Sequence, residues 1–440
     1  MPFANSFCNS PWFELHIYWD GSLAYCCAQT PYKPYPEKDN KKYNIQTTSI
    51  KEFYNSQPMK EQRLSFGLET KNTACETCWH VEDSGMFSRR YRANQKSVIF
   101  QIENFKESYK QSPHNSIFEK SFSDNGNYNG LPIDLHIDLG NHCNLACKMC
   151  NPYASTKIAA QEIKWGILDD TRTVSVNWTK DEKVWKKFTD ELLSIPNLKN
   201  VHFMGGETLL SPRLKELVKL FDKEKRYEVC FSFVTNGTIF DKELIYILSK
   251  FGRVGIEISV ETNSSHNEYI RQGSSNKQTF GNIKKFVEAS NFKNVTVTLR
   301  PALGALSIGN YHTLIEYAIE NKLLIKTNPM THPSYLVTTV LPKTIRKEYK
   351  QNLIDLKNKY SLSDDMLNKD FNITAVENYE LVALQEINKT LYDLDREDCR
   401  NQEKLLKDFT DHLKRWDSVY NLNAYDHYPE LADILKSNGY

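Results

Sequence analysis

Long apolar runs are missing from this sequence. None approaches the roughly 18 residues that a membrane-spanning helix needs, so we expect no transmembrane segment. The first residues, Met1 to Ser6, hold neither a basic nor an apolar segment, which predicts no secretory signal. A large charge of one sign is missing too. The 56 Lys and Arg balance 55 Asp and Glu to a formal net charge of +1, so charge gives no reason to expect nucleic acid as a partner.

Internal repeats and low-complexity tracts are also absent. The 40% hydrophobic and 25% charged residues are ordinary for a soluble globular protein, and 440 residues suggest two or three domains. Without a secretory signal, the ten cysteines indicate metal ligation in a reducing cytoplasm, the expected location, rather than disulfides. Eight of the ten precede residue 151, so the metal chemistry is expected in the first part of the chain.

Three cysteines, Cys143, Cys147 and Cys150, follow an alternating apolar run over 131–139 that ends at Gly140. That run predicts a strand, so the thiols lie on one tight loop at the strand's C-terminal end. Such a loop can hold three irons of a 4Fe–4S cluster and leave the fourth open for chemistry. A zinc knuckle or three unrelated core cysteines are the alternatives. Zinc needs a fourth ligand, and His142 is poorly placed beside Cys143.

A second cysteine set precedes this loop. Two β-prone runs, 13–19 and 22–27, flank Asp20-Gly21 and predict a hairpin, followed by a helix over about 50–64. The candidate ligands of one metal centre are Cys8, one of Cys26 and Cys27, Cys75 and Cys78. Because neighbouring strand residues face opposite ways, only one of the adjacent pair is expected to ligate, and we favour Cys26. A zinc ribbon would fit the C-x2-C pair equally well.

The remaining chain alternates between strand and helix patterns, which predicts a parallel sheet with crossover helices. Strands are expected at about 133–139, 199–204, 227–235, 254–260, 295–301 and 323–327. Helices are expected near 155–166, 181–193, 212–224, 241–250, 278–288 and 311–321. We expect a small cluster domain over 1–90, a linker over 91–130, an α/β domain over 131–345 and a helical region over 346–440.

Polar residues follow several of these strands, where ligands of parallel sheets bind. Two glycines that allow close approach precede a carboxylate in the Met204-Gly205-Gly206-Glu207 segment. The other candidates at strand ends or just beyond them are Asn236, Ser259, Glu261 and Arg271.

The order of these elements resembles the radical S-adenosylmethionine (SAM) superfamily, whose pattern is C-x3-C-x-aromatic-C; Met149 stands at the aromatic position here. The resemblance implies a partial (β/α)6 TIM-like barrel and a cluster whose open iron binds SAM. It further implies that Gly205, Gly206 and Glu207 hold the SAM amino group and Arg271 its carboxylate. Asn236, Ser259 and Glu261 would supply further polar contacts to SAM. The hairpin, helix and cysteines before the barrel resemble a twitch domain, the short form of the SPASM extension, which holds a second 4Fe–4S cluster.

The implied function is reductive cleavage of SAM to a 5′-deoxyadenosyl radical, followed by hydrogen abstraction from a carbon of a peptide or protein. A small metabolite or nucleotide-linked sugar is the alternative substrate. The electron donor would be a flavodoxin or ferredoxin. A non-enzymatic iron–sulfur carrier or redox sensor, and a zinc-stabilised scaffold, are alternatives from other classes. Cys230 and Cys399 are expected to be inert core residues.

Overall fold

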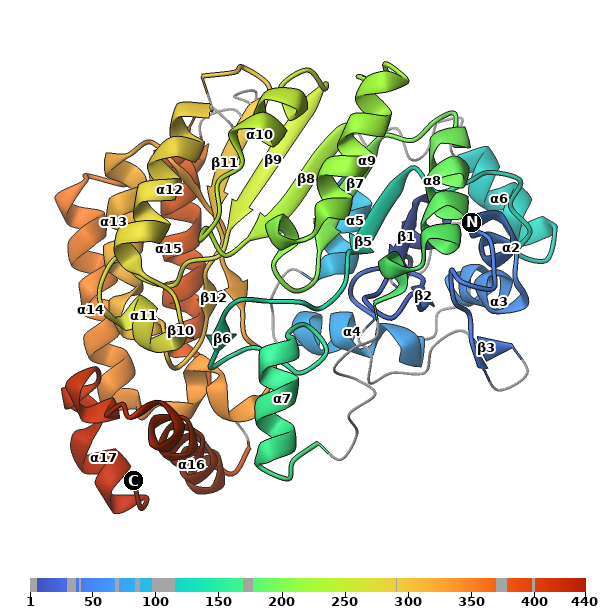
Figure 1. Cartoon of the computed structure of the whole chain (residues 1–440). Coiled ribbons are helices and arrows are strands. Elements are labelled where there is room, and N and C mark those ends of the chain that lie inside the picture. The colour runs from blue at the N-terminus through green and yellow to red at the C-terminus, as the bar shows by residue number, and fades with distance from the viewer. Residues whose placement is uncertain are drawn as a thin grey trace. The chain divides into compact units, whose positions relative to one another are not determined.

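The computed structural model describes residues 6–29, 37–38, 41–67, 71–83, 88–96, 115–168, 177–289, 291–368, 378–397 and 400–440. Figure 1 shows the helices and strands of this part of the chain. The chain divides into two compact units. The first unit comprises 1–142, 166–233 and 246–253, and the second comprises 143–165, 234–245 and 254–440.

The sheet of the first unit has the order β2-β1-β5-β7-β8. Its strands are β1 (Glu14–Ile17), β2 (Leu23–Ala24), β5 (Asp134–Asp138), β7 (Asn200–Met204) and β8 (Cys230–Thr235), whose last two residues belong to the second unit. Strands β1, β5, β7 and β8 are parallel to one another, and β2 pairs antiparallel with β1. The predicted hairpin is therefore confirmed. Its turn needs glycine because Gly21 has φ +83°.

Alternate residues of these strands form the apolar core of the first unit. Leu15, Leu135 and Val201 are fully buried, and Phe231 of β8 packs edge-on against Phe221 of α9 (Pro212–Lys223) at 5.3 Å between ring centroids. Helix α8 (Glu182–Ser194) precedes β7. The opposite face of the same strands is polar.

Two expectations for the N-terminal part need correction or comment. The single helix expected over 50–64 is two helices, α2 (Ile50–Tyr54) and α3 (Gln57–Ser65). Ser56 is the N-cap of α3, and Pro58 lies in its first turn, where proline is favoured, whereas a helix interior excludes it. The segment expected as a linker, 91–130, contains α6 (Asn115–Ser123), whose Phe118 is buried edge-on against Trp12.

The other elements of the first unit are short. Their bounds are α1 (Ser10–Phe13), β3 (Glu37–Lys38), β4 (Lys41–Lys42), α4 (Glu76–Asp83) and α5 (Arg89–Lys96).

The second unit contains the parallel strands β9 (Arg253–Ile258, whose first residue belongs to the first unit), β11 (Val295–Leu299) and β13 (Leu324–Ile325). Its helices are α7 (Thr156–Lys164), α10 (Lys242–Leu248, shared with the first unit), α11 (His266–Ile270), α12 (Asn276–Ala289), α13 (Tyr311–Glu320), α14 (Lys343–Lys359), α15 (Tyr379–Asp395), α16 (Gln402–Tyr420) and α17 (Ala432–Ser437). Two short pairs complete it: β6 (Ala146–Cys147) with β10 (Arg271–Gln272), and β12 (Ala302–Leu303) with β14 (Asn328–Pro329).

The predicted alternation of six parallel strands and helices is confirmed, with every boundary within three residues of its expected position. The fold is therefore α/β, with parallel strands joined by helices. The described part of residues 346–440 is mostly helical, as Figure 1 shows for α14 to α17.

Two further predictions concern single side chains and membrane spans. On α16, Phe409, Leu413 and Trp416 are buried as expected, whereas Val419 of the same predicted stripe is 43% exposed. Cys230 is half-buried on β8, and Cys399 lies outside the described residues. Across the described ranges, no helix is long and apolar enough to cross a membrane.

Candidate functional site

The predicted cysteine loop lies in the second unit. Cys143 and Cys147 are buried, and together with Leu145 they form one cluster against which Met149 and half-buried Cys150 pack. Cys147 belongs to β6, which pairs with Arg271 of β10, and the Cys150 amide donates to the Cys147 carbonyl at 3.0 Å. The loop is therefore shaped by backbone hydrogen bonds, and its three thiols share one small volume.

Without a bound metal, the buried surroundings of Cys147 and Cys150 favour the neutral thiol over the charged thiolate. Burial raises the pKa of Cys147 to about 11, although the neighbouring Arg271 opposes this effect and Cys143 adds to it. Burial also raises the pKa of Cys150, with further contributions from Cys147 and Cys143. Iron would supply the positive charge that such buried thiolates lack. The donor set therefore fits three ligands of a 4Fe–4S cluster.

Arg271 contacts the loop directly. Its Nη1 donates to the Cys147 sulfur at 3.6 Å, and its Nε donates to Glu261 Oε1 at 2.9 Å, with Nη2 donating to the same oxygen. Glu261 is fully buried, and its Oε2 accepts from the Ala302 amide at 2.6 Å. Burial raises the pKa of Glu261, an effect that the Arg271 charge opposes. Sequence analysis assigned both residues to SAM; the structure brings them together as a buried ion pair beside a candidate ligand.

Asn236 also lies against the cysteine loop. Its Nδ2 donates to Asn144 Oδ1 at 2.8 Å, and its Oδ1 accepts from the Thr238 amide at 3.0 Å. Half-buried Ser259 is tied to the same strand end, because its amide donates to the Thr235 carbonyl at 2.8 Å. These two candidates are therefore held at neighbouring strand ends of the second unit.

The Gly-Gly-Glu segment lies in the first unit. A side-chain carbon at Gly206 would stand 2.3 Å from the His142 carbonyl oxygen, and both glycines have positive φ, +79° at Gly205 and +47° at Gly206. Glu207 is buried, its amide donates to that same carbonyl at 2.8 Å, and its Oε1 accepts from the Leu209 amide at 3.0 Å. The glycines are thus required by close backbone packing at the chain position just before the cysteine loop.

Four N-terminal cysteines influence one another electrostatically. Burial raises the pKa of Cys8 to about 12, and Cys78 contributes. Burial likewise raises the pKa of Cys26, with contributions from Cys8 and Cys78, and that of Cys75, again with contributions from Cys8 and Cys78. Cys8, Cys26 and Cys75 thus each lie within electrostatic range of Cys78, and Cys27 also contributes to the raised pKa of Cys78. No three or more His, Cys, Asp or Glu side chains of the described residues are grouped so as to hold a single metal ion.

Cys27 has different neighbours from Cys26. Burial would raise its pKa, but His136 and Arg89 outweigh this and lower the pKa to about 5. Arg89 Nε donates to the Cys27 sulfur at 3.2 Å. Burial would lower the pKa of His136, yet Cys27 and Asp134 raise it to about 10. The two adjacent cysteines thus have different charged neighbours, but both lie beyond the end of β2, so the alternation expected for a strand over 22–27 does not reach them.

Sequence analysis missed a row of histidines on the polar face of the first unit. His16, His136 and His202 are in register on β1, β5 and β7, and Ser232 of β8 continues the row. His16 Nε2 lies 3.2 Å from Asp138 Oδ1, and His202 Nδ1 lies 2.7 Å from Ser232 Oγ. A histidine near the centre of each of three predicted strands was the available signal.

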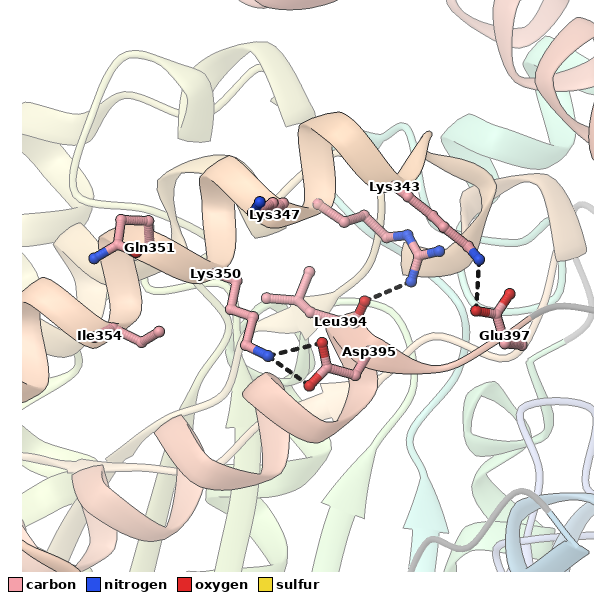
Figure 2. Close-up of a pocket in the computed structure, with 9 residues that line it drawn as sticks. Lys343, Lys347, Lys350, Gln351, Ile354, Leu394, Asp395 and Glu397 are labelled. Carbon is pink, nitrogen blue, oxygen red and sulfur yellow. Dashed lines mark hydrogen bonds and ion pairs between the residues drawn. The ribbon is translucent and has the colours of Figure 1, made fainter.

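One pocket of about 420 Å³ lies elsewhere in the second unit, between α14 and the end of α15 (Figure 2). Lys350 pairs there with Asp395 at 2.6 Å, and Lys343 pairs with Glu397 at 2.6 Å. Carboxylates thus neutralise cations on its rim, and none of the sequence-predicted site residues lines it.

Two family models match the chain. The radical SAM superfamily model matches residues 137–302, which include the cysteine loop, the Gly-Gly-Glu segment and Arg271. A model of an iron–sulfur cluster-binding domain matches residues 8–79, which include all five N-terminal cysteines. The two matches follow the order that the sequence predicted, with the second cysteine set in one and the cysteine loop in the other.

Solved structures give a more distant likeness, and no curated protein matches the chain. Streptococcus suis SuiB bound to SAM is 15% identical with a TM-score of 0.37, over 68% of this chain and 64% of that one. SuiB bound to its precursor peptide SuiA is 16% identical with a TM-score of 0.38, over 69% and 64%. Native anSMEcpe with bound SAM is 19% identical with a TM-score of 0.37, over 54% and 62%.

The matched part of this chain thus spans less than two thirds of each of these proteins, and TM-scores this low carry no inference about substrate. The assignment comes instead from the two family models, because their ranges contain both cysteine sets. The cofactors are accordingly SAM, a 4Fe–4S cluster at the radical SAM site and a second 4Fe–4S cluster in the N-terminal domain. Residues 137–302 of this chain are thus similar to the radical SAM superfamily, and residues 8–79 are similar to an iron–sulfur cluster-binding domain.

Proposed function

We propose that this enzyme abstracts a hydrogen atom from a carbon of a peptide or protein, and that its N-terminal cluster accepts the electron released when the substrate is oxidised. The observation that carries the proposal is the presence of two separate thiol sets, Cys143, Cys147 and Cys150 in one unit and the N-terminal cysteines in the other. A simple SAM cleavage reaction needs only the first set.

The chain's own residues would perform three tasks. Cys143, Cys147 and Cys150 would hold the cluster, and the Arg271 guanidinium would donate to the Cys147 sulfur, as it does in the structure. Glu207 would hold the SAM amino group, and Asn236 and Ser259 would contact its other polar groups. Glu261, whose two oxygens accept from Arg271 and the Ala302 amide, would hold Arg271 in place. Cys8, Cys26, Cys75 and Cys78 would hold the second cluster. When bound and reduced, the first cluster supplies the electron that cleaves SAM to a 5′-deoxyadenosyl radical.

The substrate class follows from the N-terminal domain. The twitch and SPASM extensions that it resembles often accompany peptide modification, which favours a peptide or protein over a small metabolite or nucleotide-linked sugar. A flavodoxin or ferredoxin would deliver the electron. The cytoplasm, where thiols stay reduced, would be the location.

The experiment measures 5′-deoxyadenosine from SAM with anaerobically purified, reduced enzyme. Cys143→Ala should abolish the product, and Cys230→Ala is the matched control, because Cys230 belongs to neither thiol set. Absence of product from the wild-type enzyme with intact, reducible clusters would refute the proposal.

Substrate class is tested by isotope transfer. A deuterated peptide pool should transfer deuterium into 5′-deoxyadenosine, whereas a deuterated pool of nucleotide sugars and small metabolites should not. Deuterium transfer from the metabolite pool and none from the peptide pool would show that the substrate is a small metabolite or nucleotide sugar instead of a peptide.

A further inference from the structure

Lys148 lies inside the cysteine loop, between Cys147 and Met149, yet its side chain is fully buried. An ammonium group is expensive to bury unless it is paired. Its Nζ lies 3.3 Å from Asp417 Oδ1, 3.9 Å from the centroid of the Tyr269 ring and 5.7 Å from that of Trp416. The charge is thus compensated by groups that lie outside the loop, two of them on α16.

The carboxylate that receives Lys148 is itself fixed. Asp417 Oδ2 accepts from the Tyr269 hydroxyl at 3.0 Å and from the Tyr440 hydroxyl at 2.7 Å. Asp417 is buried at 4% exposure. A carboxylate with three donors, all from the second unit, has little freedom to follow the lysine, so it acts as a rigid anchor.

The backbone of Lys148 is held as well. Its amide donates to the Ile270 carbonyl at 2.9 Å, and its carbonyl accepts from His412 Nε2 at 2.8 Å. Lys148, which lies between the candidate ligands Cys147 and Cys150, is therefore held by hydrogen bonds at its amide, its carbonyl and its ammonium group. Two of these three contacts come from α16, which lies outside residues 137–302 that match the radical SAM model.

We propose that Lys148 and Asp417 are positioning residues of the radical SAM site, through which α16 holds the cluster-binding loop in the geometry that the cluster requires. This inference rests on the proposed function, since it assumes a cluster on Cys143, Cys147 and Cys150. The same arrangement keeps a positive charge one residue from a ligand. Without it, the buried Asp417 carboxylate would be left uncompensated near the loop and would disfavour the reduced, more negative cluster.

The geometry predicts different results for different substitutions. Lys148→Met keeps the length and apolar stem but removes the charge and its anchor. Lys148→Arg keeps the charge. Asp417→Asn keeps the lysine and removes the carboxylate charge that pairs with it. This variant tests the same contact if Lys148→Met fails to fold. Lys407 and Asp411 form an exposed pair on the same helix at 3.4 Å, so Lys407→Met is the matched control.

The experiment is a redox titration of the full-length, anaerobically purified protein, followed by the electron paramagnetic resonance signal that changes on addition of SAM. We expect Lys148→Met to shift the midpoint of that signal to a more negative potential and to lower 5′-deoxyadenosine formation at least tenfold. The signal of the N-terminal cluster should not change. Lys148→Arg should restore most of the midpoint, Asp417→Asn should lower the amount of SAM-responsive cluster, and Lys407→Met should match the wild type.

The inference would be overturned if Lys148→Met and Asp417→Asn both had the midpoint potential, the SAM-responsive signal and the rate of 5′-deoxyadenosine formation of the wild type. An unchanged midpoint in Lys148→Met, whatever its cluster content, would also overturn the inference, because the ion pair would then have no influence on the cluster that remains. If the wild-type protein had no SAM-responsive signal, the proposed function itself would fail and the inference with it. The two failures are thus distinguished by the wild-type sample alone.

Discussion

Glu261→Gln should destabilise the second unit strongly, because it leaves the buried Arg271 guanidinium without its carboxylate. Glu261 is 0% exposed and accepts hydrogen bonds from Arg271 Nε, Arg271 Nη2 and the Ala302 amide. Glutamine has the same shape but no charge, and its amide group would turn donors toward donors. Breaking a buried pair by removing one partner costs about 3–5 kcal/mol.

The assay is urea unfolding of the metal-free protein, arranged as a double-mutant cycle of Glu261→Gln, Arg271→Met and the double variant. The double variant removes both charges and should therefore cost clearly less than the sum of the single variants, with a coupling of at least about 2 kcal/mol. Asp408→Asn, which breaks the exposed pair of Lys404 and Asp408, should cost less than about 1 kcal/mol. If the coupling energy between Glu261 and Arg271 were smaller than the cost of Asp408→Asn, the reasoning that this pair holds Arg271 beside Cys147 would be refuted.

Two other outcomes test the cysteine assignment and a buried histidine. Cys26→Ala should lower the iron content by about four atoms per chain, whereas Cys27→Ala should leave it unchanged, because Arg89 and His136 already engage Cys27 while Cys26 interacts with Cys8 and Cys78; equal iron in both variants would contradict the assignment. Burial lowers the pKa of His412 from 6.5 to about 3, so between these pH values the unfolded chain binds a proton that the folded chain does not. The unfolding free energy should therefore fall as the pH falls through this window, by up to about 1.4 kcal/mol per pH unit, and His412→Gln should lack that part of the slope in urea titrations at pH 7 and pH 5.

The elements of the α/β part were predictable because their signals are local. A strand such as β7 and the helix before it each carry a period that a short window shows. The Gly-Gly-Glu segment and Asn236 were recognisable because both directly follow such a strand. The break between α2 and α3 was also visible in the sequence, since Ser56 and Pro58 are a start signal in the middle of the expected helix.

The supporting contacts of the site were not predictable in the same way. Lys148 reads as an ordinary solvated lysine in the sequence, and its carboxylate partner lies 269 residues further along the chain. The pairing of Arg271 with Glu261 spans only ten residues, yet nothing in the sequence distinguishes a partner in the fold from two separate SAM contacts. The three histidines on β1, β5 and β7 form a row only once the strand register is known.

These contacts bear on where the catalytic part of the chain ends. A boundary at 345, shortly after the last expected strand at 323–327, was predicted, and the family model ends earlier, at 302. Yet the cysteine loop and all of 254–440 belong to one compact unit, and α16 holds the loop through Asp417 and His412. The three candidate ligands thus lie within eight consecutive residues, whereas the residue between two of them, Lys148, is held by a helix near the C-terminus. Substitutions on the buried face of α16 should consequently affect the radical SAM cluster before they affect the N-terminal one.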